Sequence, residues 1–181
     1  MRIEDVLILD LEASGLGPGS WPIEVGLSWV EEGEVRSWSS LIRPEPDWDE
    51  EAWDPMAEEV HGIGRDRLAD APSAWVVAEE LLGRLAGRPA YSDAPEFDGR
   101  WLRRLLDAHP TEAGVRLLDF DQAVGAVCGA RGADWAYERL ERTRTPHRAG
   151  PDAARMMGAI LYGVERDGPP NPDEGITGPG N

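Results

Sequence analysis

Apolar runs and alternating apolar and polar positions divide the first part of the chain into strands. The apolar run Val6–Leu11 is typical of a strand buried in the middle of a sheet. The segments Pro22–Val30 and Val35–Ile42 also have the composition of strands, and the short charged stretch 31–34 between them predicts a hairpin. Together these segments predict three adjacent strands.

The rest of the chain alternates between helical and strand patterns. Asp54 followed by Pro55 predicts a short helix that ends at Gly62, because Asp caps helix N-termini and Pro suits the first helical position. Residues 44–53 are acidic and rich in Pro and Trp, which indicates a loop. Further helices are predicted at Ser73–Ala86, Asp98–Ala108, 121–129 and Pro151–Val164, and further strands at Pro89–Ser92 and Val115–Phe120.

Three strands followed by alternating helices and strands predict an α/β fold, with a mixed five-stranded sheet flanked by helices. The chain has 181 residues, of which 41% are hydrophobic, and this suits one domain with its own core. We expect the domain to occupy residues 1–166. The remainder, 167–181, is rich in Gly and Pro and is expected to be a disordered tail.

Charge and cysteine content exclude several classes of protein. The net charge is −17, so the surface repels phosphate backbones and a broad grip on long nucleic acid is disfavoured. The single cysteine, Cys128, can form neither an internal disulfide nor a zinc cluster. The apolar run 6–9 is too short for a signal peptide, and no stretch approaches the roughly 20 apolar residues of a membrane span. We expect a cytoplasmic protein with no membrane partner.

Four carboxylates and one histidine are the candidates for chemistry. Asp10 and Glu12 end the first strand and, being two residues apart, point to the same face. Asp98 and Asp152 lie at the starts of predicted helices, where a carboxylate is also stabilised by the helix dipole alone. His147 lies in the loop before the last helix and has a side chain suited to a general base near neutral pH. As a set, these side chains could hold two metal ions and activate a water.

Other basic residues have simpler interpretations. His61 and His109 end predicted helices, where a cation is favourable, so we interpret both as structural. Arg100, Arg103 and Arg104 form a helical stripe that we interpret mainly as a solvated face, with phosphate contact as the alternative.

The candidate residues occur within motifs that follow one another in a known order. These segments are Asp10-Leu-Glu12-Ala-Ser-Gly15, Ile23-Glu-Val-Gly26, His61-Gly-Ile63, Phe97-Asp98 and His147-Arg-Ala-Gly-Pro-Asp152-Ala153. With these motifs the chain resembles the DEDD superfamily of 3′–5′ exonucleases, in the histidine-bearing DEDDh branch that includes RNase T and the exonuclease domain of DNA polymerase III epsilon. The tyrosine branch would need Tyr at the position of Arg148.

The resemblance implies an RNase H-like fold and a metal-dependent 3′–5′ exonuclease that releases nucleoside 5′-monophosphates. It implies that Asp10, Glu12, Asp98 and Asp152 hold two Mg²⁺ or Mn²⁺ ions, and that His147 is the general base. Carboxylate oxygens are the ligands that these hard cations prefer. The expected partners are short single strands of DNA or RNA, and a homodimer is expected as an alternative to a monomer because the family often dimerises.

Substrate contacts are expected near the motifs. Trp side chains stack well on bases, and two of the eight tryptophans lie near the motif residues. The candidates are Ser14, Gly15, Trp21, Trp101 and Arg148. Ala13 and Ala94 replace residues that help seat the 3′ end in the family, commonly Thr and Asn, so the choice of substrate stays open.

Three alternatives to this function remain. The first is degradation of very short RNA, as by oligoribonuclease. The second is a non-catalytic nuclease-like module that binds a protein partner through its acidic surface, and the third is an acidic metal-binding or solubility domain. A dinucleotide-binding fold is disfavoured because the turn Gly15–Gly19 lacks the G-x-G-x-x-G spacing.

Overall fold

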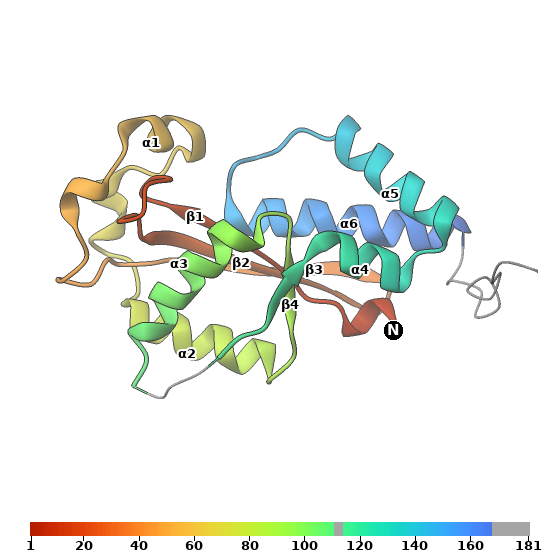
Figure 1. Cartoon of the computed structure of the whole chain (residues 1–181), viewed down its shortest axis with the longest axis horizontal. Coiled ribbons are helices and arrows are strands. Elements are labelled where there is room, and N and C mark those ends of the chain that lie inside the picture. The colour runs from red at the N-terminus through yellow and green to blue at the C-terminus, as the bar shows by residue number, and fades with distance from the viewer. Residues whose placement is uncertain (111–113, 168–181) are drawn as a thin grey trace, which may run out of the picture.

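The computed structural model describes residues 1–110 and 114–167, and its centre is one mixed sheet of five strands (Figure 1). The strand order is β3-β2-β1-β4-β5. β1 and β3 are antiparallel to β2, whereas β4 runs parallel to β1 and β5 parallel to β4. The strands are β1 (Ile8–Ala13), β2 (Pro22–Glu31), β3 (Glu34–Leu41), β4 (Ala90–Ser92) and β5 (Leu117–Asp119). The predicted α/β class with a mixed sheet is confirmed.

The hairpin between β2 and β3 closes with a tight turn. Val30 pairs with Val35 and Glu31 with Glu34, so only two residues lie between the strands. These two, Glu32 and Gly33, both have positive φ, at 53° and 77°. Positive φ at both central residues gives the turn a twist that matches paired strands.

Six α-helices and three short 3₁₀ segments surround the described part of the sheet. The predicted start of α1 is confirmed, because the side chain of Asp54 accepts a hydrogen bond from the backbone N–H of Met56. α3 begins three residues earlier than predicted, with Pro95 in its first turn, so Asp98 lies inside the helix. The helices are α1 (Pro55–His61), α2 (Ala74–Leu85), α3 (Pro95–Asp107), α4 (Phe120–Val127), α5 (Ala130–Arg142) and α6 (Ala149–Asp167), with 3₁₀ turns at Ile3–Asp5, Glu50–Ala52 and Arg65–Leu68.

The alternation of β1 assigns its side chains to two hydrophobic cores. Leu9 and Leu11 belong to the core that includes α2 and α3, on one face of the sheet. Ile8 belongs to the second core, which includes α4 and α6. Since alternate residues of a strand share a face, Asp10 and Glu12 continue the face of Ile8, toward α6.

Helix α5 was not predicted, and it packs along α6 (Figure 1). The two backbones come very close, because a Cβ on Gly163 would lie 2.3 Å from the carbonyl oxygen of Gly132. Asp167, placed by the sequence at the start of the tail, instead ends α6 and accepts a hydrogen bond from the backbone N–H of Gly132. The expected disorder of the tail concerns residues 168–181, which lie outside the described residues.

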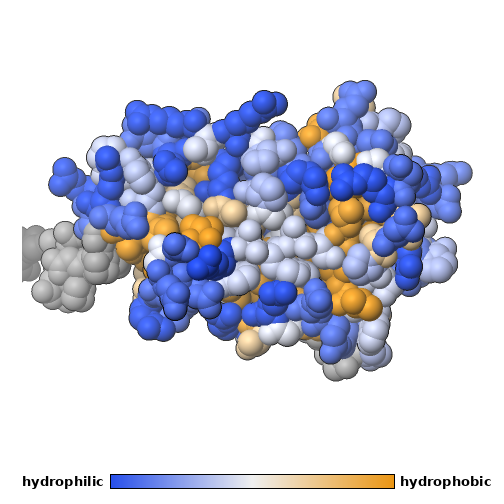
Figure 2. All heavy atoms as spheres, turned by 180° about the vertical axis from the view of Figure 1, so that it is seen from behind, coloured by the Kyte–Doolittle hydropathy of each residue, from blue (hydrophilic) through white to orange (hydrophobic). Residues whose placement is uncertain are grey.

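The face opposite to that of Figure 1 is largely hydrophilic, with apolar atoms visible in separate patches (Figure 2). Within residues 1–110 and 114–167, none of the helices is both long enough and apolar enough to cross a membrane. The apolar faces of the helices pack instead on the two sides of the sheet.

The N-terminus of α6 lies directly against β2 and β3. A Cβ on Gly26 of β2 would lie 2.2 Å from the carbonyl carbon of Ala149 and 2.4 Å from the nitrogen of Gly150. A Cβ on Gly150 would in turn lie 2.8 Å from the side chain of Ser39. The first turn of α6 can therefore reach the sheet only because these positions lack side chains.

The contact at Gly26 predicts a sharp effect of one added methyl group. Gly26→Ala must push the start of α6 away from β2, because the atoms it meets are backbone atoms that cannot rotate aside. We expect the free energy of unfolding to fall by about 1–3 kcal/mol. Thermal and urea unfolding of the variant measure this loss.

Gly158→Ala is the matched control on the same helix. An added Cβ at Gly158 meets no atom within 4 Å, and Ala is a better helix former than Gly by about 1 kcal/mol. We expect this control to be as stable as the unchanged protein or more so. Equal stability of Gly26→Ala and Gly158→Ala would contradict the tight seat of α6.

Candidate active site

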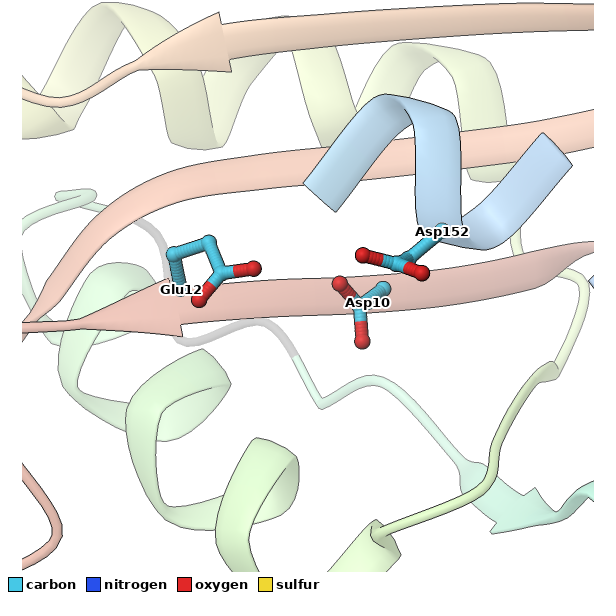
Figure 3. Close-up of side chains that lie close together, drawn as sticks. All are labelled: Asp10, Glu12 and Asp152. Carbon is cyan, nitrogen blue, oxygen red and sulfur yellow. The ribbon is translucent and has the colours of Figure 1, made fainter. Parts of the chain in front are cut away.

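Three of the predicted carboxylates converge between β1 and α6 (Figure 3). Asp10 and Glu12 project from β1 toward the first turn of α6, where Asp152 lies. One oxygen from each of the three carboxylates lies within 4.8 Å of the others. The alternation of β1 and the close seat of α6 together bring these side chains into one group.

The backbone and one arginine hold Asp152 in place. Its Oδ2 accepts a hydrogen bond of 3.0 Å from the backbone N–H of Arg148, as expected at the start of a helix. The Nε of Arg155, one turn further along α6, lies 3.4 Å from Oδ1. These contacts fix the carboxylate before any further ligand arrives.

A buried ion pair connects the start of α6 to β2. Both guanidinium contacts of Arg148 go to Glu24, at 2.8 and 2.7 Å, and Glu24 also accepts a hydrogen bond from the backbone N–H of Ala149. The side chain of Glu24 is only 3% exposed. Arg148 was predicted to bind substrate, but its guanidinium is engaged with Glu24, so in this structure it anchors the helix.

A second group of carboxylates shares Asp10 with the first. Asp98, at 2% exposure, and Asp93, from the turn between β4 and α3, each place an oxygen within 4.8 Å of one another and of Asp10. The hydroxyl of Ser92 donates a short hydrogen bond to Asp98. Asp93 was not identified from the sequence, where it belongs to no motif and differs from other acidic residues only in lying between a strand and a helix.

Burial and mutual repulsion disfavour ionisation of these groups. Burial, followed by the nearby Asp98 and Glu12 charges, raises the pKa of Asp10 well above its usual range. Burial, followed by Asp152 and Glu24, raises the pKa of Glu12 to about 8, and burial raises the pKa of Asp98 to about 7. A divalent cation among the carboxylates would relieve both costs, and the all-oxygen donor set fits Mg²⁺ or Mn²⁺.

His147 lies outside both carboxylate groups. It is exposed, in the loop between α5 and α6, and its backbone φ of 56° lies in the left-handed region. A non-glycine residue in this region is uncommon and such backbone strain is often found at functional positions. The structure thus places the predicted general base at the entrance to the first turn of α6, five residues before Asp152.

A small apolar hollow adjoins the carboxylates. Its volume is about 250 Å³, and Glu12 forms part of its wall. Leu16, Met56 and Val60 are exposed at 68%, 70% and 56%. The other apolar members are Leu11, Ala13, Ala57 and Trp101. A pocket of this size, below the roughly 300–1,000 Å³ of most ligand sites, suits one small flat group.

Of the other predicted substrate contacts, some line the hollow and some are buried in the core. Gly15 and Trp101 do line the hollow. Ser14 is buried, and its hydroxyl accepts a hydrogen bond from the backbone N–H of Trp21. Trp21 is 1% exposed, packs against Trp48, and donates from its indole to the carbonyl oxygen of Asp49. The prediction of a substrate contact is therefore wrong for Trp21 in this structure, because its ring is part of the core.

His61 has a different role from the one predicted. It is 5% exposed and lines the hollow. Burial lowers its pKa, so the ring is neutral near pH 7 and does not act as a helix-terminal cation. Its Nδ1 accepts a hydrogen bond from the backbone N–H of Ile63, which places the proton on Nε2. Nε2 has no hydrogen-bond partner among the described residues, and is therefore an unused donor beside the hollow.

Comparison with known proteins relates this geometry to nucleases through the fold. No protein-family model matches the chain, and no curated protein matches it in sequence. Exonuclease I of E. coli, solved in complex with a dA16 oligonucleotide, matches with a TM-score of 0.60 and 16% identity over 90% of this chain. The chain spans only 41% of the length of that protein.

Two further structures are covered almost completely. Exonuclease X in complex with 5′ overhanging duplex DNA matches with a TM-score of 0.56 and 20% identity, over 90% of this chain and 93% of that one. The nuclease domain of 3′hExo, a DEDDh family member bound to rAMP, matches with a TM-score of 0.62 and 13% identity, over 89% and 92%. The chain therefore has the RNase H-like fold of DEDDh exonucleases, as the resemblance in sequence predicted.

Proposed function

We propose that the protein is a metal-dependent 3′–5′ exonuclease that hydrolyses the terminal phosphodiester of a single strand and releases nucleoside 5′-monophosphates. The observation that carries this proposal is the pair of carboxylate groups sharing Asp10, next to a hollow that shares Glu12. The fold of exonucleases solved with oligonucleotides or a nucleotide supports it.

The carboxylates of the chain would hold two divalent cations. Asp10 belongs to both groups and is the shared ligand, while Glu12 and Asp152 complete one group and Asp98 contributes to the other. Bound there, the ions would supply charge stabilisation for the attacking and leaving oxygens of an in-line displacement. The rigid positions of β1 and α6 hold the carboxylates at fixed separations for this task.

His147 would take the proton from the attacking water. An imidazole has its ordinary pKa near neutral pH, which suits a general base. Its exposed position in the loop before α6 leaves it accessible to solvent and to substrate. The reaction forms a bond from the water oxygen to phosphorus and breaks the bond from phosphorus to the 3′ oxygen of the preceding nucleotide. That oxygen takes a proton from solvent and becomes the 3′-hydroxyl of the shortened strand, and the terminal nucleotide is released as its 5′-monophosphate.

The hollow would receive the terminal nucleoside. Its apolar walls suit the faces of a base, and the Nε2–H of His61 is available as a hydrogen-bond donor. The net charge of −17 and the small volume favour short single strands over long duplexes. Short RNA, as degraded by oligoribonuclease, is therefore the second candidate substrate beside single-stranded DNA.

The direct test uses single strands of DNA and RNA labelled at the 5′ end, with Mn²⁺ or Mg²⁺. We expect a ladder that shortens from the 3′ end, and we expect Asp10→Asn to abolish it because both carboxylate groups lose their shared member. Asp134→Asn, an exposed change on α5, is the control and should keep full activity. A folded protein that gives no ladder with either metal would point to the non-catalytic module.

The raised pKa values predict how the metal-free protein responds to pH. The folded state retains protons on Glu12 and Asp98 that the unfolded chain releases, so stability falls as pH rises from about 4 toward 8. We expect Tm in EDTA to fall over this window, by about 2–4 °C for each kcal/mol lost. Because Mn²⁺ binds the ionised carboxylates, it should raise Tm more at pH 8 than at pH 5.5.

Glu12→Gln serves as the comparison in that experiment. The neutral amide removes a carboxyl group whose pKa is raised to about 8, so the fall of Tm with pH should be smaller than in the unchanged protein. An identical pH dependence for the two proteins would show that Glu12 is ionised at its ordinary pKa.

The general base is tested by His147→Asn, since Asn tolerates the left-handed backbone at this position. We expect kcat for strand cleavage to fall by a factor of about 10²–10⁴. Thr145→Ala in the same loop is the control. A variant with near-normal rates would remove His147 from the role of base.

A further inference from the structure

The turn between β4 and α3 brings a fifth carboxylate to the site. β4 ends at Ser92 and α3 begins at Pro95, so Asp93 lies in a turn of two residues. The hydroxyl of Ser92 donates to Asp98 and accepts a hydrogen bond of 3.0 Å from the backbone N–H of Ala94. These bonds on either side fix the backbone that carries Asp93.

The carboxylate of Asp93 is exposed to solvent and is not engaged by another residue. Within the described part of the chain it forms no hydrogen bond or ion pair with another residue, and only its own backbone N–H and the charge of Arg155 favour its ionised form. Asp10 is in a similar situation, since no described residue donates a hydrogen bond to its side chain. Neither carboxylate therefore has a donor on another described residue, and both belong to the second carboxylate group.

Three carboxylate oxygens within 4.8 Å of one another are unfavourable without a positive charge between them. In the first group, formed by Asp10, Glu12 and Asp152, the side chain of Arg155 lies beside Asp152 and the backbone N–H of Arg148 donates a hydrogen bond to it. In the second group, Asp98 has only uncharged donors, the hydroxyl of Ser92 and the backbone N–H of Leu11, and the charge of Arg155 acts on Asp93 without forming an ion pair with it. The stronger unmet need for a cation is thus in the group that contains Asp93.

We propose that Asp93 is a direct ligand of the second divalent cation, together with Asp10 and Asp98. This inference rests on the proposed function and adds to its second ion site a carboxylate that belongs to none of the sequence motifs. Mg²⁺ in phosphate-processing enzymes is commonly held by one or two carboxylates plus the phosphates of the substrate. With a third carboxylate, the second ion is held without help from the substrate.

The consequence is that the protein binds two ions before it meets nucleic acid. The first test is a calorimetric titration of the full chain with Mn²⁺ alone, for the unchanged protein, Asp93→Asn and the control Asp134→Asn. We expect two binding events in the unchanged protein and in the control. In Asp93→Asn, one event should weaken at least tenfold while the other keeps its affinity.

Activity as a function of metal concentration gives a second readout. Asp93→Asn should need at least a tenfold higher Mn²⁺ concentration for half-maximal cleavage, with kcat recovering toward the unchanged value at saturating metal. The Tm of the variant in EDTA confirms that it is folded, and it should not fall, because the substitution removes a repelling charge.

The outcomes separate this inference from the proposed function. An unchanged protein that cleaves single strands, together with an Asp93→Asn variant whose Mn²⁺ titration and metal requirement are the same, would overturn the role of Asp93 alone. An unchanged protein that neither binds Mn²⁺ nor cleaves would overturn the proposed function itself. A selective loss of one ion in Asp93→Asn establishes the assignment.

Discussion

Repulsion between carboxylates at the end of β1 is the constraint on which this structure depends. Five acidic side chains from three parts of the chain gather there, and Asp10 belongs to both of the groups they form. Burial adds to the cost, so the folded chain holds protons on groups that would ordinarily be ionised at neutral pH. Such a site lowers the stability of the folded chain, and the surrounding packing must offset this cost.

The close packing of the first turn of α6 on the sheet offsets this cost. It also separates a rigidly held residue of the site from one that lies in a loop. Asp152 lies beyond the point where Gly26 and Gly150 allow the helix to contact β2 and β3, and is therefore held rigidly. His147 lies just before that point, in an exposed loop. Between them, Arg148 is bound to the buried Glu24 and marks the boundary. The proposed ligands Asp10, Glu12, Asp98 and Asp152 are thus on regular elements, and the proposed base lies on a loop.

The sheet and most helices were predictable from the sequence because their positions carry clear physical signals. β1 alternates between two cores, and Asp54 with Pro55 marks a helix start that the structure reproduces. Helix α5 was missed although its polar and apolar positions do recur with helical periodicity. Its buried residues are Gly132 and Ala136, since the backbones of α5 and α6 meet too closely for larger side chains. A contact made by small residues is not marked by a stripe of large apolar side chains, which is the signal that identified the other helices.

The residues of the candidate site that belong to sequence motifs could be predicted, whereas those that reach the site only through the fold could not. Asp10, Glu12, Asp98 and Asp152 were found because a motif order links them, and the structure brings their carboxylates to one place. The roles of Asp93 and His61 were identified only from the structure. In the sequence, Asp93 looks like any other acidic residue, and His61 looks like an ordinary histidine at the end of a helix. Only the structure shows that Asp93 lies in the turn between β4 and α3, and that the ring of His61 is buried with an unused Nε2–H. Trp21 was misassigned for the same reason, because the sequence alone does not show whether a tryptophan after a glycine-rich turn faces a ligand or the core. Asp93 is therefore visible only in the folded chain, because it belongs to none of the motifs and reaches the site through the turn between β4 and α3.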